Sequence, residues 1–247
     1  MKTFWVNVLL LFVICSLLAG CLQNAPSTSA ASTSAESAKH SENSTPILLP
    51  VKVSGKWGYV NGNGQLVINL QFDGASEFHE GRAAVCLGKP CFPERWMSSS
   101  GDHWGYIDSS GKMVITPQYG AASDFSEGLA SVCTGDCSSD SPKPSSQGYI
   151  NRDGEIVIPL QFGIAGDFSE GLAQVCIGTC KWKMDSGYSG KFGFIDHSGH
   201  LVINPQYDRV DDFKNGFAKV TLLVEKGKEA KRGYIDKTGK TIWQPSN

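Results

Sequence analysis

The arrangement of apolar and polar positions along most of this chain predicts short β-strands. One apolar run, Lys56–Val60, is followed after a few polar residues by a second, Leu66–Ile68, which is rich in β-branched side chains. A third run, Arg82–Val85, leads through a longer polar stretch into the next copy of the first. Short apolar runs bounded by Gly, Asn or Asp are typical of strands joined by turns. The pattern therefore predicts antiparallel meanders of three strands.

This pattern occurs five times. Each copy contains a Gly followed by an aromatic and an aliphatic residue, and the intervals between successive copies are unequal, which indicates one loop of variable length. The segment Leu48–Val53 supplies the leading strand of the first copy, so we expect five complete meanders. The recurring glycines are Gly58, Gly105, Gly148, Gly193 and Gly233.

A short turn follows each of these glycine-containing strands. The turn opens on Asp or Asn, whose side chain can accept a hydrogen bond from the backbone two residues on, and it closes on Gly, which tolerates positive φ. We expect the strand after the turn to end at a proline, Pro117, Pro159 or Pro205, because proline cannot donate to a ladder. The clearest turns are Asp108–Gly111, Asn151–Gly154, Asp196–Gly199 and Asp236–Gly239.

A second recurring segment precedes the third strand of each unit and combines an acidic residue, Phe and Gly. One unit buries too little apolar surface to be stable alone, so we expect neighbouring units to stack. The fold class predicted is an all-β array, arranged either as an open solenoid or as a closed, propeller-like ring. The segments are Glu77–Gly81, Asp124–Gly128, Asp167–Gly171 and Asp212–Gly216.

These two motifs together resemble the bacterial WG-repeat family, named for its Trp-Gly pair. Only Trp57 and Trp104 keep the Trp. The resemblance extends from about Ile47 to Pro245, and it implies an architecture and an interaction role more than a reaction. The departures are Gln147, Phe192 and Arg232 in place of Trp, and Asn215 in place of Glu.

The first twenty residues have the layout of an export signal. Lys2 precedes an apolar run, Val8–Leu18, that is too short to span a bilayer stably. The junction Leu18–Cys21 resembles the bacterial lipoprotein signal, which implies cleavage before Cys21, lipidation of its thiol and acylation of the new N-terminus, with palmitate as an expected acyl group. The alternative is an ordinary secretory signal that leaves Cys21 as a free thiol.

We therefore divide the chain into a signal peptide, residues 1–20; a lipidated Cys with a flexible tether, residues 21–46; and a WG-repeat domain, residues 47–247. The tether is rich in Ser, Thr and Ala and has no aromatic residue, so it cannot bury enough apolar surface to fold. The expected location is the cell envelope, membrane-anchored and outside the cytoplasm, and Leu22 is compatible with the outer membrane.

The cysteines divide by position. Cys15 leaves with the signal peptide and Cys21 carries the lipid, so six cysteines remain in the repeats. Their close spacing and even number in an exported chain favour three local disulfides. The alternative is half of a zinc site at each pair, although no His recurs beside them. The pairs are Cys86 with Cys91, Cys133 with Cys137, and Cys176 with Cys180.

The variable insertions are the candidate binding surface, because loops on one side of a repeat array commonly carry function. Aromatic and Arg side chains are frequent interface anchors, and aromatic rings can stack on sugars. We therefore expect an envelope protein or glycan as the partner; the alternative is that these side chains only cover a neighbouring repeat. The candidates are Phe92, Arg95, Trp96, Trp182 and Tyr188.

Charge and motifs argue against several other function classes. With 22 Lys and Arg against 24 Asp and Glu, the chain is nearly neutral, which removes the usual electrostatic argument for nucleic acid. The recurring acidic pairs, such as Asp124 with Glu127, favour a turn-stabilising role over glycoside hydrolysis. We expect no catalytic residue, no metal and no cofactor. The alternative function is a cell-envelope hydrolase acting on glycan or peptide.

Overall fold

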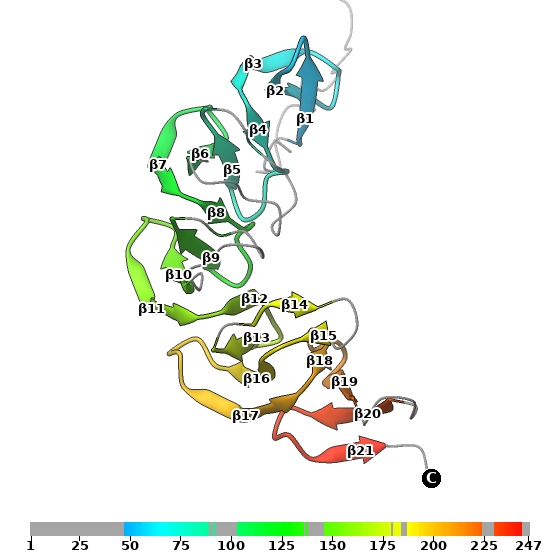
Figure 1. Cartoon of the computed structure of the whole chain (residues 1–247). Helices are drawn as coiled ribbons and strands as arrows, with labels where there is room; N and C mark the ends of the chain where they lie inside the picture. The colour runs from blue at the N-terminus through cyan, green and yellow to red at the C-terminus, as the bar shows by residue number, and fades with distance from the viewer. Residues whose placement is uncertain are drawn as a thin grey trace, which may run out of the picture. The chain divides into compact units, whose positions relative to one another are not determined.

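The computed structural model describes residues 47–88, 91, 103–135, 137, 146–178, 180–183, 187–223 and 230–243. The regular elements in these ranges are all β-strands, and they include no helix that could cross a membrane. The predicted all-β repeat array is confirmed (Figure 1). The proposed signal peptide and tether, residues 1–46, lie outside the described residues.

Five antiparallel sheets of three or four strands follow one another along the described residues, and a sixth sheet of two short strands, β14 (Trp182–Lys183) and β15 (Gly187–Tyr188), lies between β13 and β16 in sequence. Sheet 1 consists of β1 (Leu48–Val53), β2 (Lys56–Asn61) and β3 (Leu66–Phe72). Sheet 2 consists of β4 (Gly74–Ala75), β5 (Arg82–Cys86), β6 (Trp104–Asp108) and β7 (Met113–Tyr119); sheet 3 of β8 (Ala121–Ala122), β9 (Leu129–Thr134), β10 (Ser146–Asn151) and β11 (Ile156–Phe162); sheet 4 of β12 (Ile164–Ser169), β13 (Leu172–Ile177), β16 (Lys191–Ile195) and β17 (Leu201–Tyr207); and sheet 5 of β18 (Arg209–Val210), β19 (Phe217–Leu222), β20 (Lys231–Asp236) and β21 (Thr241–Trp243).

The sheets differ from the expected meanders in two ways. Four of them contain a further strand, because the chain leaving one sheet pairs briefly with the next, as when Gly74 pairs with Cys86. The prediction that strands end at the prolines is wrong, since β7 runs through Pro117 to Tyr119. The register between β6 and β7 shifts between Trp104 and Tyr106, and this irregularity accommodates a residue without an N–H.

The core lies between sheets, where an aromatic side chain of each central strand packs on a Phe of the next sheet. Tyr106 of sheet 2 is fully buried, and its ring centroid lies 4.9 Å from that of Phe125 in sheet 3. The Tyr106 hydroxyl donates to the carbonyl of Ser123 at 2.6 Å, so the buried polar atom is satisfied. The equivalent pairs are Tyr59 with Phe78, Tyr149 with Phe168, and Phe194 with Phe213.

The turn glycines pack against the preceding sheet. Gly154 has φ of 86°, and an added Cβ would lie 3.1 Å from the Ile115 side chain of sheet 2. A larger residue would be strained by the backbone angle and crowded by the isoleucine. Each turn also opens on an Asp or Asn that accepts from the backbone two and four residues on, as Asp108 does from Ser110 and Lys112, which confirms the predicted role of these side chains.

A glutamate in the loop before β5, β9 or β13 bridges sheets 2, 3 and 4 to the sheet that follows each of them. Glu80 of sheet 2 accepts from the backbone N–H of Gly128 at 2.9 Å and from the Arg152 guanidinium at 2.6 Å, both in sheet 3. The same bridge recurs at the next two interfaces, so these glutamates hold the loop and turn of the neighbouring sheet. The later bridges join Glu127 to Gly171 and His197, and Glu170 to Gly216 and Lys237.

The bridging glutamates and the Gly after each of them have positive φ, which explains why Gly follows. Glu80 has φ of 50° and Gly81 has φ of 78°, so both residues lie in the left-handed region. Asn215 occupies the equivalent position in sheet 5 with φ of 55°. Asn tolerates this conformation better than most residues, so the departure from Glu keeps the backbone while removing the carboxylate.

The bridge makes stability depend on the ionisation of Glu80. Partial burial of Glu80 raises its pKa, but the hydrogen bonds from Arg152 and Gly128 outweigh burial and hold the pKa below the ordinary value of 4.5. Because the folded pKa is the lower one, the carboxylate stabilises the fold above about pH 4.5 and loses this effect as the pH falls through the folded value. This contribution is therefore complete at neutral pH.

We predict that Glu80→Gln lowers the free energy of unfolding at pH 7 by about 1 kcal/mol, because Glu80 is partly exposed and the lost hydrogen bonds are charge-assisted. Glu77→Gln in the same loop is the matched control, with an expected change below about 0.5 kcal/mol. Urea unfolding at pH 7 and at about pH 3 measures both, and the difference between wild type and Glu80→Gln should shrink at the lower pH. Equal effects of the two substitutions would contradict the bridge.

Candidate functional site

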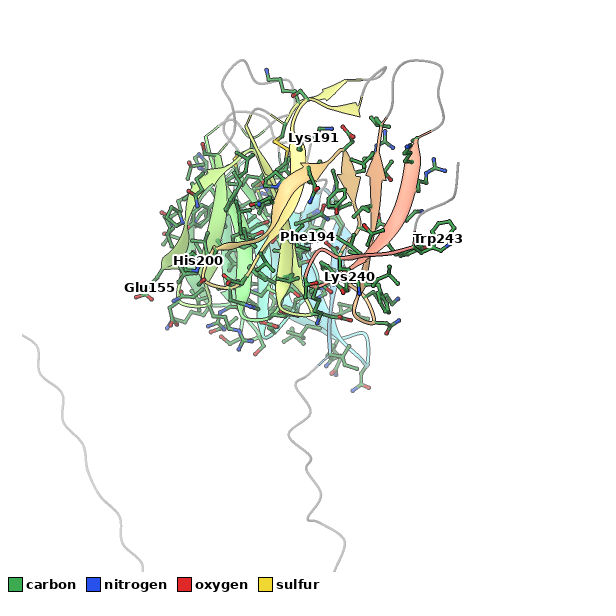
Figure 2. All side chains as sticks on the ribbon, turned by 90° about the horizontal axis from the view of Figure 1, so that it is seen from below. Glu155, Lys191, Phe194, His200, Lys240 and Trp243 are labelled. Carbon is green, nitrogen blue, oxygen red and sulfur yellow. A yellow bond between two sulfur atoms is a disulfide. The ribbon has the colours of Figure 1, made fainter. Side chains whose placement is uncertain are left out.

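The strands place two kinds of connection at opposite ends of each sheet. The short turns, with His200 and Lys240 beside them, form one edge (Figure 2), which we call the turn edge. The variable insertions begin where β5, β9, β13 and β19 end, at the edge where β16 starts with Lys191. We call this the insertion edge. The predicted binding residues all belong to insertions at this edge.

Sheet 1 shows how short the connection at the insertion edge can be when it serves only to join two strands. There the connection between β1 and β2 is only Ser54–Gly55, with φ of 50° and 83°. Two successive residues with positive φ are characteristic of the tight turn that fits a two-residue hairpin. The longer insertions of the other sheets therefore exceed what strand pairing requires, which is the main reason to look for function in them.

The three predicted cysteine pairs lie at disulfide distance at this edge. The sulfur atoms are 2.10 Å apart in Cys86–Cys91, 2.14 Å in Cys133–Cys137 and 2.11 Å in Cys176–Cys180. The first cysteine of each pair is the last or penultimate residue of its strand and is fully buried. Each pair therefore ties the first residues of an insertion to the end of a core strand.

Two of the disulfides pack directly against a glycine of the preceding chain segment. A Cβ added at Gly163 would lie 2.2 Å from the carbonyl oxygen of Gly178 and 2.8 Å from the sulfur of Cys180. Gly120 has the same relation to Gly135 and Cys137. Real Cβ atoms do not approach other atoms this closely, so the disulfide loop can fold over the chain only where the side chain is a hydrogen.

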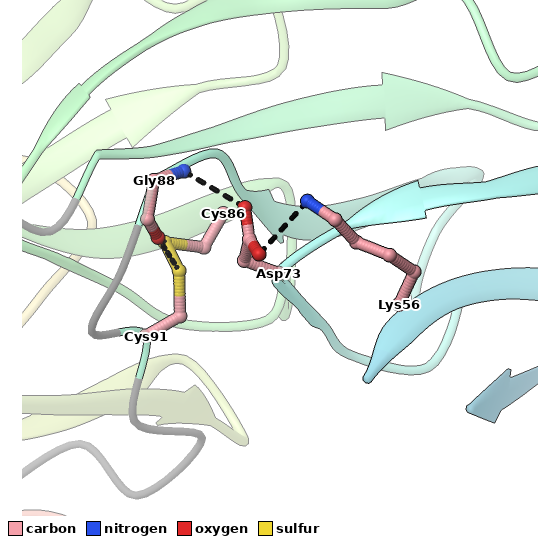
Figure 3. Close-up of a disulfide and its surroundings, with 5 residues drawn as sticks. All are labelled: Lys56, Asp73, Cys86, Gly88 and Cys91. Carbon is pink, nitrogen blue, oxygen red and sulfur yellow. Dashed lines mark hydrogen bonds and ion pairs between the residues drawn. A yellow bond between two sulfur atoms is a disulfide. The ribbon is translucent and has the colours of Figure 1, made fainter. Parts of the chain in front are cut away.

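An aspartate contacts the first and the last insertion. At the equivalent position beside the second and third insertions the residue is glycine, Gly120 or Gly163. Asp73 forms an ion pair with Lys56 at 2.9 Å and accepts from the backbone N–H of Gly88 at 3.1 Å (Figure 3). Asp208 likewise pairs with Lys191 at 2.6 Å and accepts from Leu223 at 2.8 Å. Both aspartate side chains are at least nine-tenths buried, so they fix the insertion to the array.

Two of the five candidate binding residues occupy paired backbone positions of a hairpin. The third insertion contains β14 (Trp182–Lys183) and β15 (Gly187–Tyr188), and their antiparallel register makes Trp182 and Tyr188 partners. At the base of this hairpin, the N–H of Ser189 donates to the carbonyl of Lys181 at 2.8 Å, and the Lys181 N–H donates to the Ser189 hydroxyl at 3.0 Å. The hairpin begins directly after Cys180.

The other candidates cannot be placed. Phe92, Arg95 and Trp96 of the first insertion lie outside the described residues, as does Cys21. The Trp of the Trp-Gly pair is structural in sheet 2, where Trp104 is 6% exposed and lies in the core with Cys86 and Tyr119. The described residues contain no group of three or more His, Cys, Asp and Glu side chains placed to hold a metal ion.

Sequence reasoning missed the ion pairs of the insertion edge. Lys56 and Asp73 are 17 residues apart, and so are Lys191 and Asp208. In the two intervening copies the aspartate position is Gly120 or Gly163, and neither copy has Lys at the start of its central strand. This joint change of two positions was the available signal. The residue after the Gln-aromatic pair therefore varies with the insertion it contacts: it is Asp where it accepts a backbone hydrogen bond from the insertion, and Gly where a disulfide loop lies against it.

Comparisons with solved structures give a fold likeness. A crystal structure described as that of the eukaryotic initiation factor matches with a TM-score of 0.52 at 9% identity, covering 80% of this chain and 50% of that chain. A crystal structure of the tricorn protease matches with a TM-score of 0.36 at 14% identity, covering 81% of this chain and 22% of that chain. The first likeness concerns the fold alone, and this chain spans half or less of either protein. No curated protein sequence matches this chain.

The family comparison agrees with the architecture. A family model described as WG containing repeat matches residues 57–89, 104–136, 148–178 and 192–222, which together make up more than half of the chain. The matches start in β2, β6, β10 and β16, the central strands of sheets 1 to 4, and end at or just after β5, β9, β13 and β19 of the following sheets. The fifth copy lies outside these matches, yet β20 pairs with β19 and β21 as the other central strands pair with their neighbours. The chain belongs to the WG-repeat family.

Proposed function

We propose that this chain is an exported lipoprotein, anchored in the cell envelope through Cys21, whose WG-repeat domain is a binding or scaffold module for an envelope protein or glycan. The anchor rests on the sequence, in which an apolar run leads into Leu18–Cys21. The tether of residues 22–46 would then separate the domain from the lipid surface. Several acyl chains on one residue would give lasting attachment.

The observation that carries the binding role is the hairpin of β14 and β15. Its register sets Trp182 opposite Tyr188, two residue types that commonly anchor interfaces and stack on sugar rings. Its base follows the Cys176–Cys180 pair and is closed by the hydrogen bonds between Lys181 and Ser189. Holding a recognition loop in one conformation before binding reduces the entropy lost on association. The ties at the base of the hairpin support a preorganised binding role.

The structural contacts of the recurring carboxylates also support a binding role over a hydrolytic one. The recurring glutamates that could have formed a hydrolytic pair are engaged in bridges between sheets, as Glu80 is with Gly128 and Arg152. Asp124, the acidic partner in the next loop, lies 3.6 Å from the ring of His79. Groups that must hold neighbouring sheets together are poorly suited to exchange protons with a substrate. These contacts favour the binding module over the hydrolase.

The anchor is tested by producing the full chain and a Cys21→Ser variant in a bacterial host supplied with an alkyne analogue of palmitate. We predict that the wild-type chain incorporates the label and sediments with membranes. The variant should remain unlabelled and uncleaved, because the signal peptidase for lipoproteins requires the lipidated Cys. Equal labelling of the two chains would contradict lipidation at Cys21, and a cleaved, unlabelled wild-type chain would indicate an ordinary secretory signal.

The binding role is tested with the full chain carrying Cys21→Ser, so that binding is measured in solution. We predict that chemical cross-linking to isolated envelopes, or retention on immobilised envelope glycans, falls at least about tenfold in a Trp182→Ala, Tyr188→Ala variant. Leu66→Ala, Val67→Ala, which removes two exposed apolar side chains of sheet 1, is the matched control and should retain binding. Equal capture by all three proteins would refute the role of the hairpin, and turnover of an envelope glycan or peptide would favour the hydrolase.

A further inference from the structure

One face of every sheet is built around the same row of three residues on adjacent strands. In sheet 2 the row is Ala84, Tyr106 and Ile115, which are partners in the strand register. In the first four rows the aromatic residue in the middle packs against the Phe of the following sheet. The five rows are Pro50–Tyr59–Ile68, Ala84–Tyr106–Ile115, Ser131–Tyr149–Ile158, Gln174–Phe194–Ile203 and Lys219–Tyr234–Trp243.

The fifth row differs from the others in exposure. Its central residue, Tyr234, is 44% exposed, whereas the four equivalent aromatic residues are 0% exposed. Trp243 is 55% exposed at the position where the other rows have a buried Ile. Phe217, which neighbours this row on β19, is 45% exposed, against 7% for Leu172 at the same position in sheet 4. We call Phe217, Lys219, Tyr234 and Trp243 the end face (Figure 2 labels Trp243).

The four covered rows show what this kind of face binds. Each receives a loop in which an acidic residue directly precedes Phe, such as Asp212–Phe213. Phe213 is 1% exposed against Phe194, and the Asp212 carboxylate accepts from the Gln174 side chain at 2.9 Å. In sheet 4 the first position of the row thus contacts the acidic residue, while in all four covered rows the middle position contacts the Phe ring. In the end face these two positions are Lys219 and Tyr234.

The end face is also more basic than the faces it resembles. Lys219 replaces Ala84, Ser131 or Gln174 of the earlier rows and is exposed. Arg232 stands at the position of the family's Trp, and Asn215 removes the carboxylate that the earlier sheets extend toward the next one. Every one of these changes adds a positive charge or removes a negative one. An incoming segment with negative charge is therefore favoured.

From this continuity and charge we infer that the end face is a docking site for a segment of another protein that carries an acidic residue directly before Phe. The Phe would lie on Tyr234 and Trp243, and the acidic side chain would pair with Lys219. This surface is separate from the insertion edge, so the inference does not depend on the proposed function. A folded second copy of the chain is a poor occupant, because Phe125, Phe168 and Phe213 are already buried at 1 to 2% exposure and Phe78, which is partly buried, already packs on Tyr59.

The probe is a peptide with the sequence of residues 123–129, Ser-Asp-Phe-Ser-Glu-Gly-Leu, capped at both ends. Titrated into the full chain carrying Cys21→Ser, it should bind saturably by calorimetry and change the intrinsic tryptophan fluorescence. Replacing Phe by Ala in the peptide, or Tyr234 by Ala in the protein, should weaken binding at least about tenfold. Leu66→Ala, which removes an exposed side chain of sheet 1, serves as the control protein and should bind as the wild type does.

Charge exchange identifies the acidic contact. Lys219→Glu should weaken binding of the peptide, and a peptide with Lys in place of Asp should bind this variant better than it binds the wild type. Circular dichroism and thermal unfolding of each variant establish that it is folded. Absence of saturable binding to the wild type would overturn the inference, and so would binding unchanged by Tyr234→Ala and Lys219→Glu. Self-association that the peptide does not displace would assign the face to a second copy, and vesicle binding lost in Trp243→Ala would assign it to a membrane.

Discussion

The structure depends on one repeated contact, the packing of an aromatic residue from each central strand on a Phe of the following sheet. The ring centroids of the four pairs are 4.8 to 5.0 Å apart. In three of the pairs a tyrosine hydroxyl donates to a carbonyl of the neighbouring sheet, at Ser76, Ser123 or Gly166. Burial raises the pKa of Tyr59, so its hydroxyl keeps its proton and remains a donor. The hydrophobic core therefore forms between neighbouring sheets, and among the described residues no single sheet contains a core of its own.

The other recurring features follow from that contact. Once two sheets are packed, the loop before the third strand lies beside the next sheet's turn, where Glu80 can reach Gly128 and Arg152. The close approach of sheets also explains why the turn residue packed on Ile115 is Gly154. At the opposite edge the strand ends need only a two-residue connection, so length and composition there are free to vary. A rigid array with one variable edge is an arrangement suited to binding.

Much of the fold could be predicted from the sequence because the determining interactions are local. Strand periodicity, the Asx turns and the pairing of Cys176 with Cys180 involve residues within a few positions of each other. The Glu80 bridge could not be predicted in this way, since its partners are 48 and 72 residues away and lie together only after the sheets stack. The strands that continue through proline were missed because the register shift is a property of the paired strands.

The candidate site was predictable in part. The register of β14 and β15 brings Trp182 and Tyr188 together, which their spacing in sequence did not indicate. The end face could not have been found from composition, because Tyr234 has the same local motif as Tyr106 and differs only in what covers it. Exposure is thus the property that separates a structural repeat position from a candidate docking position.

The most direct test of the account is hydrogen exchange of the folded chain with Phe125→Ala, which removes a side chain that is 2% exposed between sheets 2 and 3. Truncation of a buried Phe costs about 3 to 5 kcal/mol. If cores belong to pairs of sheets, amide protection should fall in β6 of sheet 2 as much as in β10 of sheet 3, and less in sheet 5. Loss of protection confined to sheet 3, which carries the substitution, would contradict the account.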